Sequence, residues 1–168
     1  MHTVCTSSVT MLFADDANIF VSGNSLDEIE TNINNDLKAL SIWFKLNKLS
    51  LNIHKTKFMI IKSRKKKIPP TMLNINIDKQ KIQQVIHTKF LGVIIDEHLT
   101  WDNHIKYTTS KLAKTIGILY KARHKLDRKS LLMLYNTLVL PHITYCLIIW
   151  GKTYDKHIKR VQVAQNKI

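Results

Sequence analysis

The spacing of apolar residues changes its period several times along the 168-residue chain. Near the N-terminus, two apolar runs flank a pair of aspartates, Asp15 and Asp16, within residues 9–22 (VTMLFADDANIFVS). Neighbouring residues of a strand point to opposite faces of a sheet, so adjacent aspartates can share one task only where a tight turn interrupts this alternation. The pattern therefore predicts a β-hairpin with both acids at its tip.

From residue 26 the apolar positions fall three or four residues apart, which indicates an amphipathic helix. Ser25 followed by Glu28 is a capping-box pattern, so we expect this helix to begin there and to end near Asn47. Its apolar face should pack on the sheet formed by the hairpin. The apolar positions are Leu26, Ile29, Ile33, Leu37, Leu40 and Phe44.

The middle of the chain contains short β-rich runs at residues 57–61, 73–77, 82–86 and 89–95. Asp78 and Lys79 predict a turn between two of them. The run at 89–95 (KFLGVII) is apolar enough to be a central strand. Together with the hairpin and its helix, these runs predict an α+β part that covers residues 1–97.

From Trp101 onward the period is helical. Ile105, Leu112, Ile116 and Leu119 mark one helix, and a second helix follows Asp127 as its N-cap. Pro141 should bend or restart that helix, and the apolar run at 138–150 is too short to span a bilayer and predicts a buried helix. A last helix is expected over 158–168. Residues 98–168 therefore predict an all-helical part.

Charge narrows the partners that this chain can have. Lys and Arg number 26 against 12 acidic residues, which gives a net charge of +14. Such a surface attracts polyanions, nucleic acid before anionic membrane. A membrane-surface protein is the least favoured reading, because the helix at 26–46 has its acids near its start and not a cationic polar face.

The positive charge is concentrated between Asp36 and Asp78, where no acidic residue occurs. We favour nucleic acid as the partner of this block. Taken alone, residues 64–67 fit a solvated surface loop at least as well as a nuclear-import or phosphate-contact patch. The candidate nucleic-acid-binding residues are Lys57, Lys62, Arg64, Lys65, Lys66 and Lys67.

The aspartate pair is the main candidate for chemistry. Two neighbouring carboxylates resist ionising together unless a hard cation such as Mg²⁺ lies between them. The alternative is that Asp is a common turn former and the pair only ends a strand. The histidines show no paired metal-ligand spacing, and Cys5 and Cys146 are too few for a disulfide framework, which favours a reducing, intracellular compartment.

Several stretches, in order, resemble the second half of the polymerase domain of reverse transcriptases from non-LTR (LINE-type) retrotransposons. Residues 13–16 (FADD) resemble the catalytic doublet motif, and residues 49–59 (LSLNIHKTKFM) the motif that follows, with Asn52 and Lys55 at its usual spacing. The resemblance continues through residues 89–96 (KFLGVIID), 99–105, 134–151 and 161–168.

The resemblance implies a partial polymerase palm over 1–97 and a helical thumb, with the start of a downstream segment, over 98–168. Phe13 and Ala14 would lead into the doublet. Asp15 would be a ligand of catalytic Mg²⁺ or Mn²⁺, and Asp16 a second ligand or an orienting group. Lys55 would lie near the triphosphate and protonate the leaving pyrophosphate; its alternative is an ordinary surface lysine.

The same resemblance assigns Phe90, Leu91 and Gly92 to a primer grip, with a core strand as the alternative. It implies an RNA template, a DNA primer and deoxynucleoside triphosphates as partners, and a nuclear location; no membrane is implied, and protein partners are not indicated. Trp101, Trp150 and Tyr145 are assigned to packing, because aromatic residues at helical spacing are mostly core.

One departure from the family matters for mechanism. The family takes a further metal-binding aspartate from a strand upstream of the doublet, and no such strand precedes the doublet in this sequence. The opening residues also read as a strand met partway, so we expect a fragment that is inactive as a polymerase by itself. The alternative function is a non-catalytic, basic nucleic-acid-binding remnant of a degenerate element.

Overall fold

The computed structural model describes residues 5–69 and 73–166, and it is a mixed α and β structure, as predicted. It divides into two compact units. The N-terminal unit comprises residues 1–59 and 64–85, and the C-terminal unit residues 60–63 and 86–168. The predicted division into palm and thumb at residue 97 concerns family domains and stays a prediction.

The N-terminal unit begins with the predicted hairpin. Strand β1 (Val9–Phe13) pairs antiparallel with β2 (Asp16–Phe20), with Phe13 opposite Asp16. Residues 5–8 are not a strand; the backbone N–H groups of Thr6 and Ser7 donate to the carboxylate of the buried Asp36. The expected strand is therefore wrong for these residues, because a side chain and not a neighbouring strand takes their hydrogen bonds. Residues 1–4 lie outside the described part.

Helix α1 (Leu26–Leu46) has the predicted bounds. The Ser25 hydroxyl accepts from Glu28 N–H at 3.2 Å, and the Glu28 carboxylate accepts from Asn24 N–H at 3.0 Å, so the cap satisfies two backbone donors. Among the strands, β4 (Asn76–Ile77) makes the main contacts with this helix. The hydrophobic pattern instead predicted that the helix packs on the 9–22 hairpin.

The remaining strands of this unit are shorter than predicted. β3 (Lys57–Phe58) pairs in parallel with β6 (Gln83–Gln84), and β4 forms a hairpin with β5 (Gln80–Lys81) through the predicted Asp78–Lys79 turn. Side chains of α1 explain part of the shortening. Asn34 and Glu30 bond to backbone groups of residues 74 and 76, which a longer strand would place in a ladder.

The C-terminal unit begins with a second hairpin, β7 (His87–Phe90) and β8 (Val93–Asp96). A single central strand over 89–95 is therefore wrong. Leu91 and Gly92 have φ of 43° and 85° and form a two-residue turn between the strands. Two left-handed residues match the twist of paired strands, so Gly92 turns the chain back instead of continuing it.

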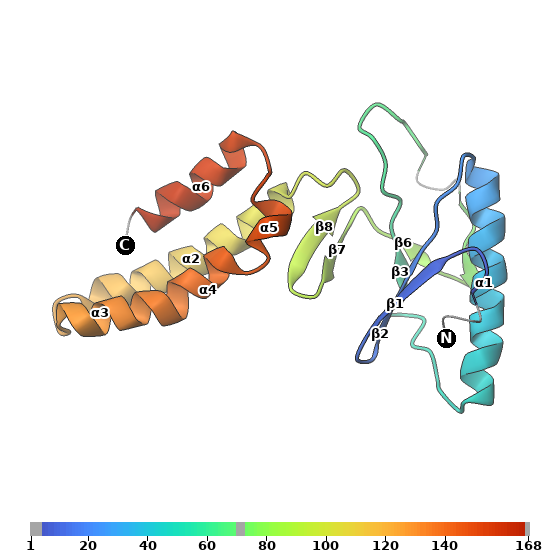
Figure 1. The fold of residues 1–168 in the computed structure, drawn as a ribbon, viewed down its shortest axis with the longest axis horizontal. Coiled ribbons are helices and arrows are strands. Elements are labelled where there is room, and N and C mark those ends of the chain that lie inside the picture. Colours follow the sequence, from blue (N-terminus) through green and yellow to red (C-terminus); the bar gives the residue numbers. More distant parts are fainter. Residues whose placement is uncertain (1–4, 70–72, 167–168) are drawn as a thin grey trace. The chain divides into compact units, whose positions relative to one another are not determined.

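The helices follow as predicted in order. They are α2 (Asp102–Ala122), α3 (Arg128–Leu134), the wide π-turn η1 (Tyr135–Val139), α4 (Leu140–Thr144), α5 (Leu147–Trp150) and α6 (Asp155–Gln165). Asp127 caps α3 by accepting from Ser130 N–H. Figure 1 shows α2 running beside α3 and α4, with α6 along its other side. The buried core comprises Ile105, Leu112, Leu119, Val139, Trp150 and Val161; Ile168 lies outside the described residues.

The apolar run at 138–150 is not the buried helix that its composition predicted. The chain breaks at Tyr145 and Cys146, the latter left-handed, and Ile148 is 91% exposed while Val139 and Trp150 are buried. Pro141 cannot donate a backbone hydrogen bond, and just before it Leu140 N–H bonds to the carbonyl of Tyr135 in a widened turn. In the described part, no helix combines the length and the apolar character of a membrane span.

Candidate active site

The aspartate pair lies at the tip of the β1–β2 hairpin, as the sequence predicts. Ala14 and Asp15 form the two-residue turn, and Asp16 is the first residue of β2. Ala14 is left-handed, with φ of 51°, a conformation that costs an L-residue roughly 1 kcal/mol and excludes β-branched side chains more strongly. The small Ala14 therefore permits the turn that puts two carboxylates side by side.

Both carboxylates are exposed, and neither takes part in a hydrogen bond or ion pair within the described part of the chain. Asp16 shares its face of the hairpin with Val9, Met11 and Phe13, all of them more than half exposed. Exposed carboxylate oxygens on adjacent residues suit a hard cation such as Mg²⁺, which commonly takes one or two carboxylates and completes its shell with water and phosphate. The donor set thus fits a magnesium ion.

The two carboxylates do not form a complete protein cage. Within residues 5–69 and 73–166, no three His, Cys, Asp or Glu side chains come together in a way that could hold a metal ion. A metal at Asp15 and Asp16 would therefore need ligands from substrate, solvent or another polypeptide segment.

Lys55, the candidate proton donor, is exposed in the turn between α1 and β3, in the same compact unit as the doublet. Asn52 organises this turn. Its side-chain oxygen accepts from Lys55 N–H at 3.2 Å, and its carbonyl accepts from the Thr56 hydroxyl at 3.0 Å. Asn52 thus fixes the backbone from which Lys55 projects, which gives a local physical reason for the spacing of the two residues.

The predicted primer-grip residues form the β7–β8 turn in the C-terminal unit. Phe90 ends β7, and Leu91 and Gly92 are the turn itself. The Tyr145 hydroxyl donates to the carbonyl of Leu91 at 2.6 Å. A Cβ at Gly92 would lie 3.1 Å from Cε1 of the Tyr145 ring, so glycine is needed both for its φ and for this close approach.

Similar proteins were found over most of this chain. The chain is 26% identical over 96% of its length to the probable RNA-directed DNA polymerase from transposon X-element of Drosophila melanogaster. It is 29% identical over 92% of its length to that from transposon BS of the same species, and 23% identical over 93% to the polymerase from mobile element jockey of Drosophila funebris.

The chain is homologous to non-LTR retrotransposon reverse transcriptases. It spans 18% and 17% of the X-element and BS polymerases, so the similarity concerns one segment of much longer reverse transcriptases. No protein-family model matches the chain. No solved structure matches it either.

The basic residues expected to contact nucleic acid are divided between the two compact units. Lys57, Arg64, Lys65, Lys66 and Lys67 are exposed in the N-terminal unit. Lys62 lies in the C-terminal unit, where its side chain is only 13% exposed and its ammonium group is 3.2 Å from the Glu97 carboxylate. Lys62 is therefore a weaker candidate than the others.

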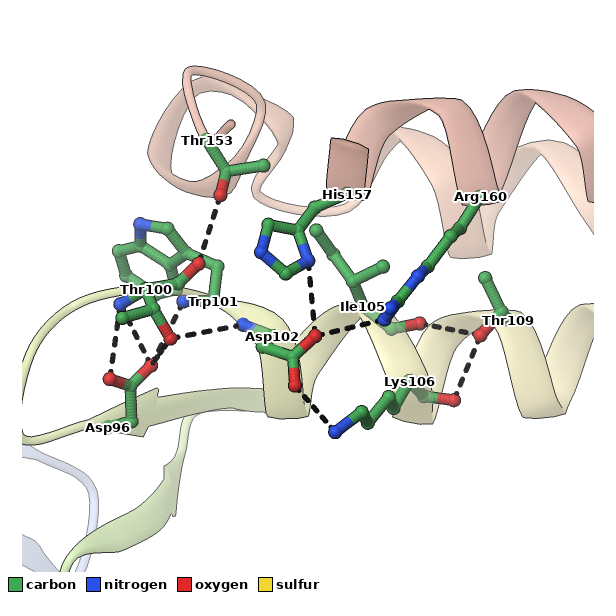
Figure 2. Close-up of polar contacts among 10 residues, drawn as sticks. All are labelled: Asp96, Thr100, Trp101, Asp102, Ile105, Lys106, Thr109, Thr153, His157 and Arg160. Atoms are coloured by element: carbon green, nitrogen blue, oxygen red, sulfur yellow. Dashed lines mark hydrogen bonds and ion pairs between the residues drawn. The ribbon is translucent and has the colours of Figure 1, made fainter. Parts of the chain in front are cut away.

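Asp96 is a structural carboxylate that the sequence did not single out. It is 7% exposed and accepts hydrogen bonds from the backbone N–H groups of Thr100 and Trp101 and from the Thr100 hydroxyl (Figure 2). The backbone N–H of His98 donates to the same carboxylate. Burial opposes its ionisation, but these hydrogen bonds outweigh burial and hold the pKa of Asp96 below its usual value. Asp96 fixes the turn that connects β8 to α2.

Asp102, in the first turn of α2, joins this helix to α6. Its carboxylate pairs with Lys106 on α2 and lies 2.9 Å from Arg160 Nη1 and 3.1 Å from His157 Nδ1 on α6 (Figure 2). The hydrogen bond from Lys106 is the main reason that the pKa of Asp102 is lowered. The contact between Asp102 and Arg160 could not be predicted from the sequence, because it depends on how α6 packs against α2.

Proposed function

We propose that this chain is the segment of a retrotransposon RNA-directed DNA polymerase that carries its catalytic aspartate doublet and the start of its thumb. The observation that carries the proposal is the position of Asp15 and Asp16. They are adjacent, exposed carboxylates at the tip of a hairpin, inside a chain that is similar to such polymerases over almost its whole length.

In this mechanism Asp15 and Asp16 would hold Mg²⁺, or Mn²⁺ in its place. The chemistry that such ions would supply there is activation of the 3′ hydroxyl of a DNA primer and stabilisation of the leaving pyrophosphate. Lys55 projects from a turn fixed by Asn52, and its ammonium group can give a proton to the departing pyrophosphate. Deoxynucleoside triphosphates and an RNA template complete the proposed set of substrates.

The β7–β8 turn at Leu91 and Gly92 would position the primer strand. Its backbone is fixed by the Tyr145 hydroxyl, so the turn can present a constant surface to nucleic acid. The exposed basic residues of 57–67 would contact phosphates of the template or primer. The nuclear location that the resemblance implies belongs to the same proposal.

Metal binding gives the first test. Titration of the chain with Mn²⁺, followed by paramagnetic broadening of NMR signals, should broaden residues around the hairpin tip. Asp15→Asn/Asp16→Asn should abolish that broadening, while Asp155→Asn, an exposed aspartate on α6, should leave it unchanged. Broadening that persists in the double variant would contradict the metal role.

Catalysis gives the second test. We expect the chain alone not to extend a DNA primer on an RNA template, because two carboxylates position Mg²⁺ poorly without further ligands. Placed within a complete polymerase of this type, the segment should support synthesis that falls by about 10²–10³-fold in Asp15→Asn, the scale on which preorganised charge stabilisation is lost. Synthesis that does not depend on Asp15 would contradict the proposal.

A second function is favoured by one specific observation, the net charge of +14. A non-catalytic nucleic-acid-binding protein needs only the charge. This function predicts that single-stranded nucleic acid binds in a salt-sensitive way and that Asp15→Asn leaves this binding intact. It also predicts that Mn²⁺ does not bind at the hairpin tip.

A further inference from the structure

His104, in the first turn of α2, is a buried histidine that has no part in the proposed polymerase mechanism. The residue is 4% exposed, and the centroid of its ring lies 5.6 Å from that of Trp150 on α5. The backbone N–H of Ile94, on β8, donates to its Nδ1 atom at 3.3 Å. One side chain of α2 thus contacts both α5 and the β7–β8 hairpin.

The N–H group that His104 accepts from is on the outer edge of the hairpin. β7 and β8 are joined by a two-residue turn, so Phe90 and Val93, which flank the turn, form a hydrogen-bonded pair. Pairs alternate along an antiparallel ladder, and the backbone groups of the next pair, Lys89 and Ile94, therefore point away from the partner strand. The Ile94 N–H needs an acceptor outside the hairpin, and His104 supplies it.

This hydrogen bond requires one protonation state of the histidine. A backbone N–H can only donate, so Nδ1 of His104 carries no hydrogen and the neutral ring carries its proton on Nε2. Protonation of the ring would place a hydrogen on Nδ1, directed at the hydrogen of the Ile94 N–H. Two donors would then face each other and the bond would be lost.

The surroundings of His104 favour the neutral ring. Burial lowers the pKa of His104 below its usual value, and the first turn of a helix is also unfavourable for a positive charge. The next ring along α2, that of Tyr107, has its centroid 6.5 Å from that of His104. The Nζ atoms of Lys89 on β7 and Lys111 on α2 lie 5.4 and 4.9 Å from the Tyr107 centroid, so the nearby charge on this side is positive.

The carboxylates nearest to His104 along the chain have other partners. Asp102, in the same turn of α2, pairs with Lys106 and with two side chains of α6. Asp96, at the end of β8, accepts from backbone N–H groups of the loop that follows it. No ion pair joins His104 to a carboxylate among the described residues. An imidazolium here would be buried without a counter-ion.

We propose that neutral His104 is a positioning residue for the β7–β8 hairpin, and that its protonation releases the β8 edge from the start of α2. The hairpin has a second attachment, the bond from the Tyr145 hydroxyl to the Leu91 carbonyl, and a phenol does not titrate in the range of a histidine. In acid the hairpin would stay tethered at its turn while its outer edge is freed. The inference goes beyond the proposed function and does not depend on it, because it concerns contacts within the C-terminal unit.

The direction of the pH effect follows from the lowered pKa. Above about pH 6.5, His104 is neutral in the attached and the released states, so the attachment has its full stability. As pH falls below this value, the released state takes up a proton that the attached state does not. Stability is therefore lost until the pH reaches the folded pKa, and the equilibrium shifts toward release by up to about tenfold per pH unit.

Amide hydrogen exchange followed by NMR between about pH 5 and pH 7.5 tests the proposal. After division by the intrinsic exchange rate at each pH, the protection of the β7–β8 amides should fall by up to about tenfold per pH unit below about pH 6.5. The protection of Leu112 and Leu119, which are buried in α2, should change much less. An equal loss at all of these amides would overturn the proposal in favour of acid unfolding of the whole unit.

His104→Asn removes the titrating group and keeps an acceptor, since the side-chain oxygen of asparagine can take the place of Nδ1. Hairpin protection in this variant should stay constant over the same pH range. The matched control is His124→Asn, which removes an exposed histidine of the same unit and should lose hairpin protection as wild type does. An acid loss in His104→Asn as large as that of wild type would overturn the proposal.

Two further variants test the other histidines beside these elements. His98 follows β8, with Nε2 3.6 Å from the Glu97 carboxylate, and His157 on α6 has Nδ1 3.1 Å from the Asp102 carboxylate. Both lie beside a carboxylate, so protonation should strengthen their contacts. His98→Asn and His157→Asn should therefore keep the acid loss of hairpin protection. Its disappearance in either variant, with retention in His104→Asn, would assign the effect to that histidine and overturn the proposal.

A second measurement on wild type does not depend on how well any variant folds. The ¹⁵N resonance of His104 Nδ1 should be that of an unprotonated nitrogen at neutral pH, and the ring should titrate below about pH 6.5. A proton on Nδ1 at neutral pH, or a titration at or above about pH 6.5, would overturn the proposal. Neither measurement involves metal or nucleic acid, so failure of Mn²⁺ binding at Asp15 and Asp16 would count against the polymerase function alone.

Discussion

At the scale of single residues, Asp96 organises the entry to α2. Four donors converge on its carboxylate, three from backbone N–H groups and one from the Thr100 hydroxyl. Hydrogen bonds to a charged group are worth roughly 1.5–3 kcal/mol each before the cost of burying the group is subtracted. The turn at 97–101 therefore depends on the ionised form of one side chain.

This dependence predicts a pH effect. The folded pKa of Asp96 is lowered, so its stabilisation is fully present above the unfolded pKa near 3.9 and is lost as pH falls through the folded pKa. Asp96→Asn should lower the free energy of unfolding by about 2 kcal/mol at pH 7 and flatten its decline below pH ~4. Urea denaturation of the C-terminal unit between pH 3 and 7 measures both effects.

Asp155→Asn serves as the control, because Asp155 is an exposed aspartate on α6, and it should shift the unfolding free energy by no more than about 0.5 kcal/mol. If the free energy of unfolding falls equally in acid for wild type and for Asp96→Asn, Asp96 does not supply the pH dependence.

The sequence could predict some residues of the candidate site and not others. Asp15 and Asp16 stand out because their turn chemistry is local, within four residues of chain. Asp96 and Asp102 carry no such signal: the role of Asp96 depends on a loop that folds its N–H groups inward, and that of Asp102 depends on a helix more than 50 residues away. Local sequence cannot encode a contact of that separation in a readable pattern.

At the scale of elements, the β7–β8 turn and the helices are held together by Tyr145. Its hydroxyl bonds to Leu91, and its own carbonyl accepts from Nε1 of the buried Trp150 at 2.8 Å. The position of the turn is thus fixed through the helical core. The sequence assigned Tyr145 to packing, but its side chain is 51% exposed and its main contribution is this hydrogen bond.

Tyr145→Phe isolates that bond, because it keeps the ring that lies against Gly92. We expect the unfolding free energy to fall by about 0.5–1.5 kcal/mol and the amide hydrogens of the β7–β8 hairpin to exchange faster. Hydrogen exchange followed by NMR measures the second effect.

Tyr120→Phe is the matched control. The Tyr120 hydroxyl has no hydrogen-bond partner in the described part of the chain, and its ring contacts Arg123, which the substitution preserves. If neither variant changes the rate of amide exchange in the β7–β8 hairpin, Tyr145 does not fix the turn.

The helices could be predicted from the sequence and most short strands could not. The cap at Ser25 and the three-to-four spacing define α1 to the residue, since both signals are local. The strand pattern at 89–95 was misleading, because its apolar residues belong to two strands separated by the Leu91–Gly92 turn. In the 73–77 segment, polar side chains from α1 replace ladder partners, which no property of the segment itself indicates.

At the scale of the whole molecule, the two compact units have separate buried cores. Leu37, Leu40 and Ile77 are buried in the N-terminal unit, and Ile105, Leu112 and Trp150 in the C-terminal unit. Since each core is buried within one unit, we expect each unit to unfold with its own transition.

Leu40→Ala and Leu112→Ala test this expectation, because both remove buried side chains, 2% and 0% exposed. Each should destabilise its own unit by about 2–5 kcal/mol and leave the other transition in place. Amide hydrogen exchange followed by NMR reports the two units separately, through residues of α1 for the N-terminal unit and of α2 for the C-terminal unit. A single transition lowered equally by both variants would contradict the prediction.

The wide turn at Tyr135–Val139 has a consequence for comparing this chain with its relatives. A π-turn holds one residue more than an α-helical turn, so it displaces every following side chain by about 100° around the helix axis. A related chain with one residue fewer here can form a continuous α-helix and, with a gap aligned to this turn, presents the equivalent positions to the core after position 139. A gap in this turn therefore preserves the helix face, and counting residues across it without the gap misassigns buried and exposed positions.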